Sequence, residues 1–549
     1  MDFVFANQDS SGWIGPEVFD LTKPRYLWGR YLFLFGVIQL IEYDPSIADS
    51  AIPQIWKFVE LAHTMLQNNE GMDIWGQTRW GDFVMVLEWL YEHYPNDNED
   101  LLVDTMSLLK ANGTRWDEVL SQSVFPTVAV ENLPNPFNNP LVWHGVNMAE
   151  GLKSGAAAYR YTHNETLLDL MSNGWDLLFE YHGRPSGIFA ADEHLAGLQA
   201  IRGTELCVIV ETMFTGSYLF QVSGDTKFAD RAERIAYNAL PAQLTGTMWS
   251  RQYLQEQNQV AARNMTDNPF PSDGPYSNVF GLEPNYPCCT VNHPQGYPKF
   301  VTNAFVTTPD KSSLVHVYLG PFATQTTLAN NNNVNVSVDT MYPFADTLTT
   351  TINADQAFTY YVRVPSWVPN ATIAVNGGNP EAVSPQNGLQ SIQVGAGTTT
   401  LVMDVTPEIT LEQRPENSIA VHRGPLHYAF DISRNYTVLK QNAMQPLAVD
   451  LQFLYTDTWE YAIDPDTITF NYDPPANGTL PSPIYDHELP PMSMTVTACQ
   501  ITWGLGGETF ADSPPENATC SGSPMNITLW PYGATKLRIG EFPTFKAND

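Results

Sequence analysis

The spacing of apolar residues changes near residue 310, and this change limits the possible folds more than any other feature of the sequence. Before it, apolar residues recur every three or four positions, which predicts amphipathic helices. After it, short runs alternate apolar and polar residues between Asn, Gly and Pro turns, which predicts β-strands. We therefore expect a helical domain followed by β-sheet modules, because the two periods bury their apolar faces in different ways.

Eight segments carry the helical period: 24–43, 52–67, 82–94, 101–112, 143–162, 166–182, 205–224 and 228–240. Asn, Asp, Gly or Pro separates neighbouring segments, so consecutive helices should pack as antiparallel pairs. Such pairs can close into a toroid of helical hairpins whose loops meet at one end. A plain helical bundle would fit the same pattern.

The alternating runs between residues 313 and 405 are typical of a β-sandwich. The last hundred residues predict either another small β module or strands that return to the first one. A chain of 549 residues exceeds what a single core can bury. We expect three domains: a helical domain at 1–310, a β-sandwich at 311–435 and a β-rich module at 436–549 that could complete the sandwich.

The charge balance is strongly acidic, with 59 acidic and 26 basic residues and a net charge of −33. This surface repels phosphate backbones and anionic lipids, so we expect no nucleic-acid partner. The most apolar early stretch, 26–43, is interrupted by Arg30, which favours a buried helix over a membrane span. We therefore expect no membrane association, while the oligomeric state is not predicted.

Nine Asn-x-Ser/Thr sequons are spread along the chain, a density typical of secreted proteins. Residues 1–17 lack the basic and apolar regions of a signal peptide. We expect an extracellular glycoprotein, with a start that is truncated in this sequence.

The chain has only five cysteines, two of which lie in the β-rich C-terminal part. Cys499 and Cys520 are 21 residues apart there. In a secreted protein this pair predicts a disulfide.

Three cysteines then remain: Cys207, Cys288 and Cys289. Glu205 precedes Cys207 by two positions, and an extended lead-in to the following helix could point both side chains the same way. One carboxylate and three thiolates form a soft ligand set that suits tetrahedral Zn²⁺. A disulfide between the adjacent cysteines, or three buried thiols in a core, would fit the spacing equally well.

Four longer stretches resemble one known family. They are GIFAADEHLAGLQAIRGTELCVIVETMF (187–214), FADRAERIAYNALPA (228–242), SNVFGLEPNYPCCTVNHPQGYPKF (277–300) and RGPLHYAF (423–430). They closely resemble glycoside hydrolase family 127, the β-L-arabinofuranosidase-like proteins. The resemblance extends from about residue 11 to residue 430.

The resemblance implies an (α/α)6 barrel followed by β-sandwich modules, with a zinc-bound cysteine as the nucleophile. By position, Glu205, Cys207, Cys288 and Cys289 correspond to the family's zinc ligands, and Cys288 to its nucleophile. Glu193 corresponds to its acid/base glutamate. Relatives generally carry further helices near the start, so the toroid could lack its first helices.

The resemblance also suggests substrate contacts. His144 matches a histidine that contacts the sugar in the family, and Trp80 stands near the position of another such histidine. We add His194 and Tyr253 as candidate sugar contacts, and Asp192 as an alternative proton donor to its neighbour in sequence.

Together these features predict a secreted, retaining, exo-acting glycosidase that removes terminal β-L-arabinofuranose or a similar sugar from plant-type glycans. Two alternatives stay open. One is an inverting glycosidase in which Glu193 and Glu205 act as acid and base and the cysteines are structural. The other is a non-catalytic carbohydrate-binding descendant of the enzyme.

Overall fold

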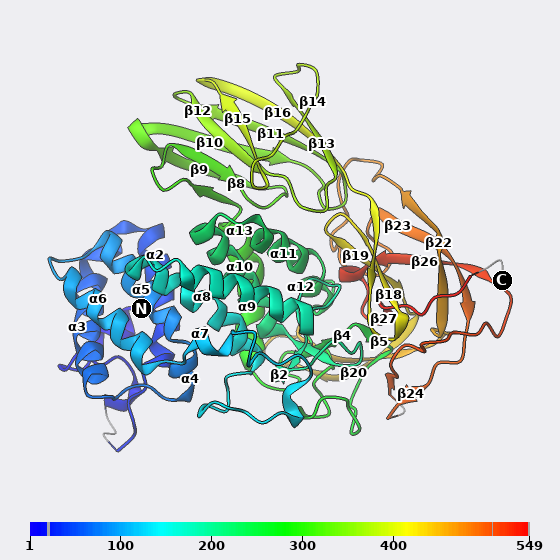
Figure 1. The fold of residues 1–549 in the computed structure, drawn as a ribbon, viewed down its shortest axis with the longest axis horizontal. Coiled ribbons are helices and arrows are strands. Elements are labelled where there is room, and N and C mark those ends of the chain that lie inside the picture. Colours follow the sequence, from blue (N-terminus) through cyan, green and yellow to red (C-terminus); the bar gives the residue numbers. More distant parts are fainter. Residues whose placement is uncertain (19–21, 508, 547–549) are drawn as a thin grey trace. The chain divides into compact units, whose positions relative to one another are not determined.

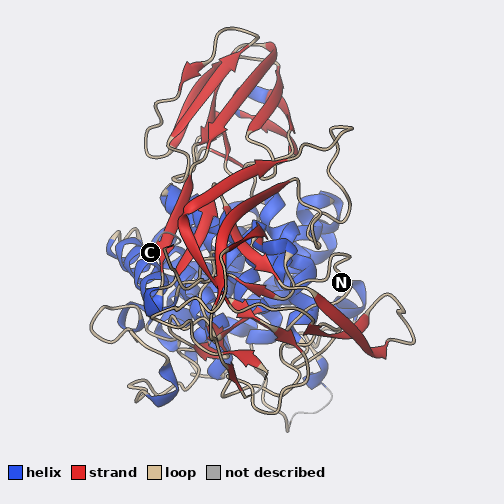
Figure 2. Ribbon diagram, turned by 90° about the vertical axis from the view of Figure 1, so that its right-hand side faces the viewer, coloured by secondary structure: helices blue, strands red, loops and turns tan. Residues whose placement is uncertain are grey.

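The computed structural model describes residues 1–18, 22–507 and 509–546. Helices predominate up to residue 302 and strands from residue 305 onward (Figures 1 and 2). This order confirms the change of structure predicted from the apolar spacing. Packing divides the chain into two compact units: Met1–Pro126 with Asn132–Leu178, and Thr127–Glu131 with Phe179–Asp549.

The first unit is helical. Its long helices are α2 (Trp28–Tyr43), α3 (Ala48–Gln67), α5 (Trp80–His93), α6 (Glu99–Asn112) and α8 (Gly145–Thr162). Helix α5 packs against α2, α6 and α8, and α3 packs against α6. The short helices are α1 (Asp2–Ala6), α4 (Ile74–Thr78) and α7 (Trp116–Val119), while α9 (Thr166–His182) continues into the second unit.

Helix α8 is buried from Gly145 to Ala158 because its small residues allow close packing. A Cβ atom on Gly151 would lie 2.4 Å from the Trp116 ring. A helix that is buried on every side forms the centre of a helical core.

In the second unit, α10 (Leu206–Ser223) packs against α11 (Thr226–Tyr237) and α13 (Cys288–Thr302), and α12 (Ala239–Ala242) follows α11. Each of the eight predicted helical segments is helical. Helix α13 escaped prediction because Pro294 and Pro298 lie inside it and obscure the helical period. Among the described residues nine helices have at least twelve residues, fewer than the six pairs of a complete (α/α)6 barrel.

Helix α10 is the one helix in the described part of the chain that is long and apolar enough to cross a membrane. Of its apolar window, 78% is buried inside the protein, as in the core helix of a soluble protein.

A small four-stranded sheet leads into α10. Its order is β2-β1-β3-β4, formed by β1 (Ala191–Asp192), β2 (His194–Leu195), β3 (Gly203–Glu205) and β4 (Leu254–Glu256). Strand β3 ends at the residue that immediately precedes α10, so this sheet fixes where that helix begins.

Two further sheets form the predicted β-sandwich. The six-stranded sheet has the order β14-β13-β16-β11-β10-β9 and the four-stranded sheet the order β15-β12-β8-β7. The strands are β7 (Phe305–Thr307), β8 (Ser313–His316), β9 (Ala323–Leu328), β10 (Asn332–Asp339), β11 (Thr347–Ala354), β12 (Phe358–Arg363), β13 (Asn370–Val375), β14 (Glu381–Ala382), β15 (Leu389–Val394) and β16 (Gly397–Thr406).

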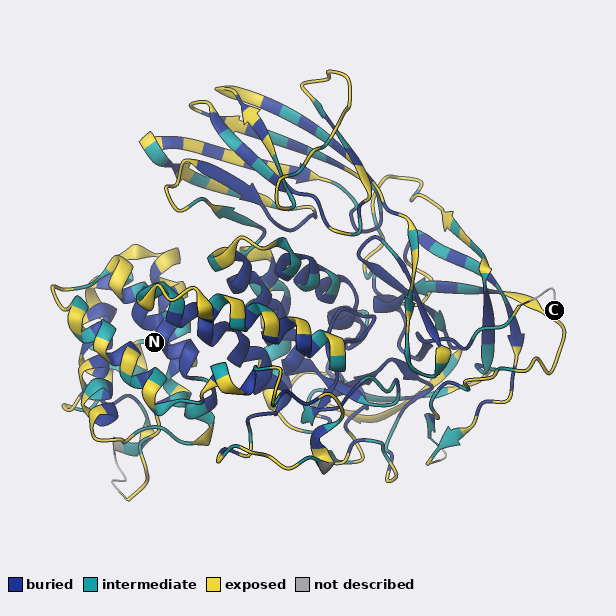
Figure 3. Cartoon of the chain, in the orientation of Figure 1, coloured by how far each residue is buried: buried dark blue, intermediate teal, exposed yellow. Residues whose placement is uncertain are grey.

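The two sheets face each other across a common core. Leu348 and Met403 of one sheet and Tyr360 of the other line the same internal cavity. Burial alternates strictly along β10, where Val334 and Val336 point inward between exposed neighbours (Figure 3). This period of two is the signal that predicted the strands.

The last large sheet joins strands from both sides of residue 435. Its order is β17-β18-β19-β26-β23-β22, and β27 connects β19 to β5. The strands are β5 (Asn258–Gln259), β17 (Ile409–Gln413), β18 (Ile419–Arg423), β19 (Leu426–Asp431), β22 (Tyr461–Tyr472), β23 (Met492–Gln500), β26 (Met525–Pro531) and β27 (Arg538–Ile539). The C-terminal strands thus extend a sheet that begins before residue 435, and the predicted domain limits stay a prediction.

The remaining strands form two small sheets: β20 (Arg434–Gln441), β21 (Val449–Tyr455) and β6 (Ala261–Ala262) in one, and β24 (Leu505–Gly506) and β25 (Phe510–Ala511) in the other. Cys499 and Cys520 form a disulfide with their Cα atoms 5.5 Å apart. The predicted pairing of these two cysteines is therefore present in the structure.

Candidate active site

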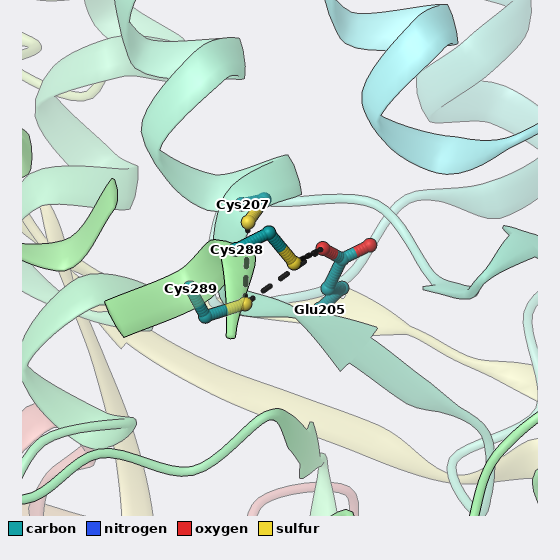
Figure 4. A group of neighbouring side chains, drawn as sticks. All are labelled: Glu205, Cys207, Cys288 and Cys289. Atoms are coloured by element: carbon teal, nitrogen blue, oxygen red, sulfur yellow. Dashed lines mark hydrogen bonds between the residues drawn. The ribbon is translucent and has the colours of Figure 1, made fainter. Parts of the chain in front are cut away.

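Four side chains converge where two helices begin (Figure 4). Glu205 ends β3, Cys207 lies in the first turn of α10, and Cys288 and Cys289 open α13. Sγ of Cys207 lies 3.2 Å from Sγ of Cys289. Oε1 of Glu205 lies 3.6 Å from Sγ of Cys288 and 3.7 Å from Sγ of Cys289. All four donor atoms lie within 4.8 Å of one another.

The backbone of Glu205 explains how two residues so close in sequence reach the same point. Its ψ of 141° is extended, and the helix begins at the next residue. The side chain of Glu205 therefore leaves the strand on the same side as Cys207 leaves the helix, as the sequence predicted for an extended lead-in.

The three sulfurs differ in exposure. Cys207 and Cys289 are buried, whereas Cys288 is exposed. All three cysteines are free, so the structure does not form a disulfide between the adjacent pair. The two neighbouring cysteines at the start of α13 therefore lie in different environments: Cys289 is inside the cluster and Cys288 is at its solvent-exposed side.

Burial and crowding set the charges of the cluster. Burial raises the pKa of Cys207 and of Cys289 well above the usual range. Burial, followed by the charge of Glu193, does the same to the pKa of Glu205. Hydrogen bonds from the thiols of Cys207 and Cys289 lower the pKa of Cys288 to about 2. The accessible sulfur is therefore the one that most readily becomes a thiolate.

The geometry fits a tetrahedral metal ion. Zn²⁺ binds sulfur at about 2.3 Å and carboxylate oxygen at about 2.0 Å, which places neighbouring ligands about 3.5 to 3.8 Å apart. The observed separations between the ligand atoms, 3.2 to 3.7 Å, are close to this range. In addition, Oε2 of Glu205 is buried and has no hydrogen-bond partner among the described residues. An ion would satisfy it, so these four residues can hold a metal.

Glu193 occupies the tight turn between β1 and β2. Its φ of 72° is in the left-handed region, which is uncommon for a residue other than glycine. Its neighbours Asp192 and His194 pair with each other and hold the turn. Tyr253 donates a hydrogen bond to Oε1 of Glu193. The carboxyl group is thus fixed by a strained turn and a buried hydroxyl, as is common at functional sites.

Three other predicted residues lie beside Glu193. Asp192 is 2% exposed and accepts hydrogen bonds of 2.6 and 2.8 Å from Arg202, which ties its carboxyl group into an ion pair, and its role as an alternative proton donor stays a prediction. His194 is half-buried in β2. Tyr253 is 1% exposed and its hydroxyl donates to Glu193, so it can position that carboxyl group, while its contact with a sugar stays a prediction.

The other two predicted sugar contacts belong to the first unit. His144 precedes α8, is buried, and meets the Trp75 ring edge-on at 5.4 Å. Trp80 is 2% exposed and donates a hydrogen bond of 3.1 Å from its indole to the carbonyl of Thr114. Trp80 is therefore part of the helical core, and the structure does not support its prediction as a sugar contact.

Sequence reasoning missed Arg251. This side chain is fully buried and donates hydrogen bonds of 2.9 Å to the carbonyl of Tyr286 and the hydroxyl of Thr290. Its charge lowers the pKa of Cys288 further, after the hydrogen bonds from Cys207, Cys289 and Tyr253. The only signal in the sequence was its place two residues before Tyr253, which does not reveal burial beside the cysteines.

Residues 142–301 match the model of the β-L-arabinofuranosidase GH127 catalytic domain, and residues 315–403 match that of the GH127 middle domain. The four candidate ligands and Glu193 all fall within the first match. Among curated proteins, none matches the chain.

Similar solved structures cover most of the chain. A protein described as a glycoside hydrolase has a TM-score of 0.68 at 15% identity, over 99% of this chain and 87% of that one. A GH127 β-L-arabinofuranosidase from Geobacillus stearothermophilus T6 has a TM-score of 0.64 at 13% identity, over 98% of this chain and 84% of that one. A further GH127 β-arabinofuranosidase has a TM-score of 0.56 at 14% identity, over 84% and 68%.

At these identities the likeness shows the fold, a helical toroid followed by β domains as the sequence predicted. The two domain models identify the family, because both describe GH127 domains. They match this chain in the order of its helical region and its β-sandwich. The matched parts of the chain, residues 142–301 and 315–403, therefore carry the catalytic and middle domains of glycoside hydrolase family 127.

Proposed function

We propose that this glycoside hydrolase is a retaining exo-glycosidase that releases terminal β-L-arabinofuranose, or a similar furanose, from plant-type glycans. One observation carries the proposal: the exposed thiol of Cys288 lies beside the buried ligand atoms of Glu205, Cys207 and Cys289. A carboxylate oxygen of Glu193 lies within 4.8 Å of one of Glu205. The names of the similar structures support the choice of sugar.

Cys288 is the nucleophile, because it alone of the three cysteines is exposed and its pKa is low. Its thiolate attacks the anomeric carbon, and the bond between that carbon and the glycosidic oxygen breaks. Glu193 donates its proton to the departing oxygen. The sugar is then bound covalently to the sulfur.

The second step reverses the roles. Glu193 accepts a proton from a water molecule, whose oxygen attacks the anomeric carbon while the carbon–sulfur bond breaks. The electron pair returns to Cys288 as thiolate. Two successive displacements retain the anomeric configuration. Tyr253 keeps the Glu193 carboxyl in place through both steps.

We propose Zn²⁺ as the ion, since three sulfurs and one carboxylate are the ligand set that this ion prefers in tetrahedral sites. Glu205, Cys207, Cys288 and Cys289 would hold it. When bound, it would supply the positive charge that keeps the cysteines deprotonated.

The inverting alternative is less well supported. Inverting enzymes keep their two carboxyl groups roughly 6.5 to 9.5 Å apart to leave room for a water molecule. Carboxylate oxygens of Glu193 and Glu205 lie within 4.8 Å of each other. Moreover, Glu205 is 1% exposed and its oxygen faces sulfur.

The proposal is tested by following hydrolysis of 4-nitrophenyl β-L-arabinofuranoside with NMR. The β anomer of arabinose should appear first, and first appearance of the α anomer would establish inversion instead. Metal analysis of the purified protein should give about one zinc per chain. Cys288→Ser should abolish turnover. A zinc-loaded wild-type protein that binds the sugar but never cleaves it would support the non-catalytic alternative.

We also propose that the protein is secreted and N-glycosylated. Seven of the sequon asparagines are exposed: Asn164, Asn335, Asn370, Asn435, Asn477, Asn517 and Asn526. The other two, Asn112 and Asn264, are half-buried. The Cys499–Cys520 disulfide also suits an oxidising compartment. Protein produced in a secreting eukaryotic cell should lose mass on treatment with peptide N-glycosidase. An unchanged mass would contradict glycosylation.

A further inference from the structure

We propose that Asp273 is a specificity-determining residue that forms a hydrogen bond with a hydroxyl group of the sugar held against Cys288. This inference rests on the proposed function, because it concerns the sugar of the same site. Asp273 lies in the loop between β6 and α13, at residues 263–287. Nothing in its sequence context distinguishes it from the other acidic residues of the chain.

The loop fixes the position of Asp273. One carboxyl oxygen, Oδ1, accepts a hydrogen bond of 2.6 Å from the side-chain amide of Asn285. The backbone N–H of Asp273 donates to the carbonyl of Phe270 at 3.2 Å, and Phe270 is itself 2% exposed. The side-chain amide of Asn268 donates to the carbonyl of Asp273 at 3.4 Å. The side chain is therefore oriented before any ligand binds.

The second oxygen, Oδ2, has no such partner. It is buried, and no hydrogen bond reaches it from the described residues. Buried polar atoms in folded proteins nearly always have partners, because leaving one without a hydrogen bond is costly. An oriented carboxyl oxygen that lacks a partner in the protein is suited to receive one from a ligand.

The surroundings of Asp273 identify that ligand. Asn285, which holds Asp273, lies three residues before Cys288 in the sequence. The next residue, Tyr286, packs its ring against Tyr253, which donates a hydrogen bond to Glu193. Asp273 is therefore tied to the segment that carries the proposed nucleophile and contacts the residue that holds the proposed acid/base. Burial, and then the charges of Glu193 and Asp192, raise the pKa of Asp273 to about 8.

Tyr286 adds an aromatic wall to this neighbourhood. Its side chain is 47% exposed, and its ring meets that of Tyr253 edge-on at 5.5 Å. A furanose whose anomeric carbon faces Cys288 carries hydroxyl groups that need partners once water is excluded. A carboxyl group and an exposed aromatic ring are the two kinds of group that recognise a sugar.

The test compares Asp273→Ala with wild type on 4-nitrophenyl β-L-arabinofuranoside and on its 2-deoxy, 3-deoxy and 5-deoxy analogues. Asp273→Ala should lower kcat/KM for the full sugar by about 10- to 100-fold. For the analogue that lacks the hydroxyl bound by Asp273, the kcat/KM values of wild type and variant should differ by less than about twofold. Glu283→Ala, which removes an exposed acidic side chain of the same loop, is the matched control and should behave as wild type.

Two outcomes would overturn the inference. One is an Asp273→Ala enzyme with wild-type kcat/KM on the full sugar. The other is an equal loss on every analogue, which would assign Asp273 a purely structural role. Asn285→Ala should show the same analogue dependence in weaker form, because Asn285 acts through Asp273. Failure of the proposed function would look different, since the wild-type protein itself would then not hydrolyse the furanoside.

Discussion

The hydroxyl of Tyr253 donates a hydrogen bond to Oε1 of Glu193 from a side chain that is 1% exposed. Tyr253 immediately precedes β4, and β4 pairs with β3, the strand that ends at Glu205. Strand β3 also pairs with β1, which leads into the turn at Glu193. One small sheet therefore positions the proposed acid/base, its hydrogen-bond donor and the first candidate metal ligand.

Removal of that hydroxyl should impair catalysis more than binding. We expect Tyr253→Phe to lower kcat by about 10- to 100-fold, because Glu193 loses the donor that orients it. Zinc content and KM should change by less than about twofold. Steady-state kinetics and metal analysis check both. Tyr43→Phe is the control, since Tyr43 ends α2, is 89% exposed and has no role in the proposed site. A Tyr253→Phe enzyme with wild-type kcat would contradict the positioning role.

Loss of the carboxylate ligand should release the metal. We expect Glu205→Gln to weaken zinc affinity by at least about 100-fold, because a neutral amide replaces the only oxygen donor of the cluster. Competition with a chromogenic chelator measures the change. Glu211→Gln, which alters a carboxylate of the same helix that pairs with Lys299 at 2.9 Å, should keep wild-type affinity. Equal zinc affinity in both variants would remove Glu205 from the ligand set.

The disulfide should stabilise the protein without affecting catalysis. Cys499 and Cys520 close a loop over a sequence separation of 21 residues, so their joint replacement by alanine should cost about 3 kcal/mol of stability. Neither residue belongs to the cysteine cluster. Calorimetry should show a lower Tm at unchanged kcat/KM. A loss of zinc in the double variant would show that the disulfide and the site are coupled.

Lys536 should make stability depend on pH. Burial lowers its pKa to about 7, and its amine donates to the carbonyls of Pro241 and Gly533 at 2.8 and 2.9 Å. Below pH 7 both folded and unfolded chains carry the proton. Between pH 7 and the unfolded pKa of about 10.4, only the unfolded chain keeps it, so stability rises with pH.

The Lys536 contribution is isolated by comparison with Lys536→Met. The stability of wild type relative to this variant should rise by about 1.4 kcal/mol per pH unit between pH 7.5 and 9.5. Calorimetric Tm values over this range check the trend, and the difference should level off below pH 7. A constant difference at every pH would show that Lys536 titrates normally in the folded protein.

The regular elements could be predicted because their signals are local. The alternation of Val334 and Val336 with polar residues defines β10 without reference to the rest of the chain. Helix α13 could not be predicted in this way, because Pro294 and Pro298 weaken its local helical signal. Its packing against α10, which stabilises it, joins segments that are distant in the sequence. The candidate ligands Glu205, Cys207, Cys288 and Cys289 could be grouped because few cysteines are present and because their sequence motifs resemble those of a known family. Their spacing alone was also compatible with a disulfide between the adjacent cysteines or with buried thiols.

The order of helical and β regions, the disulfide pair and the residue types available for the site follow from the sequence without any knowledge of the packing. Packing, by contrast, is what exposes Cys288 while it buries Cys289, places Trp80 in the core, and lets Asn285 hold Asp273. This division arises because the apolar period and the residue types are properties of short segments. Burial and the approach of side chains some eighty residues apart depend on how those segments pack.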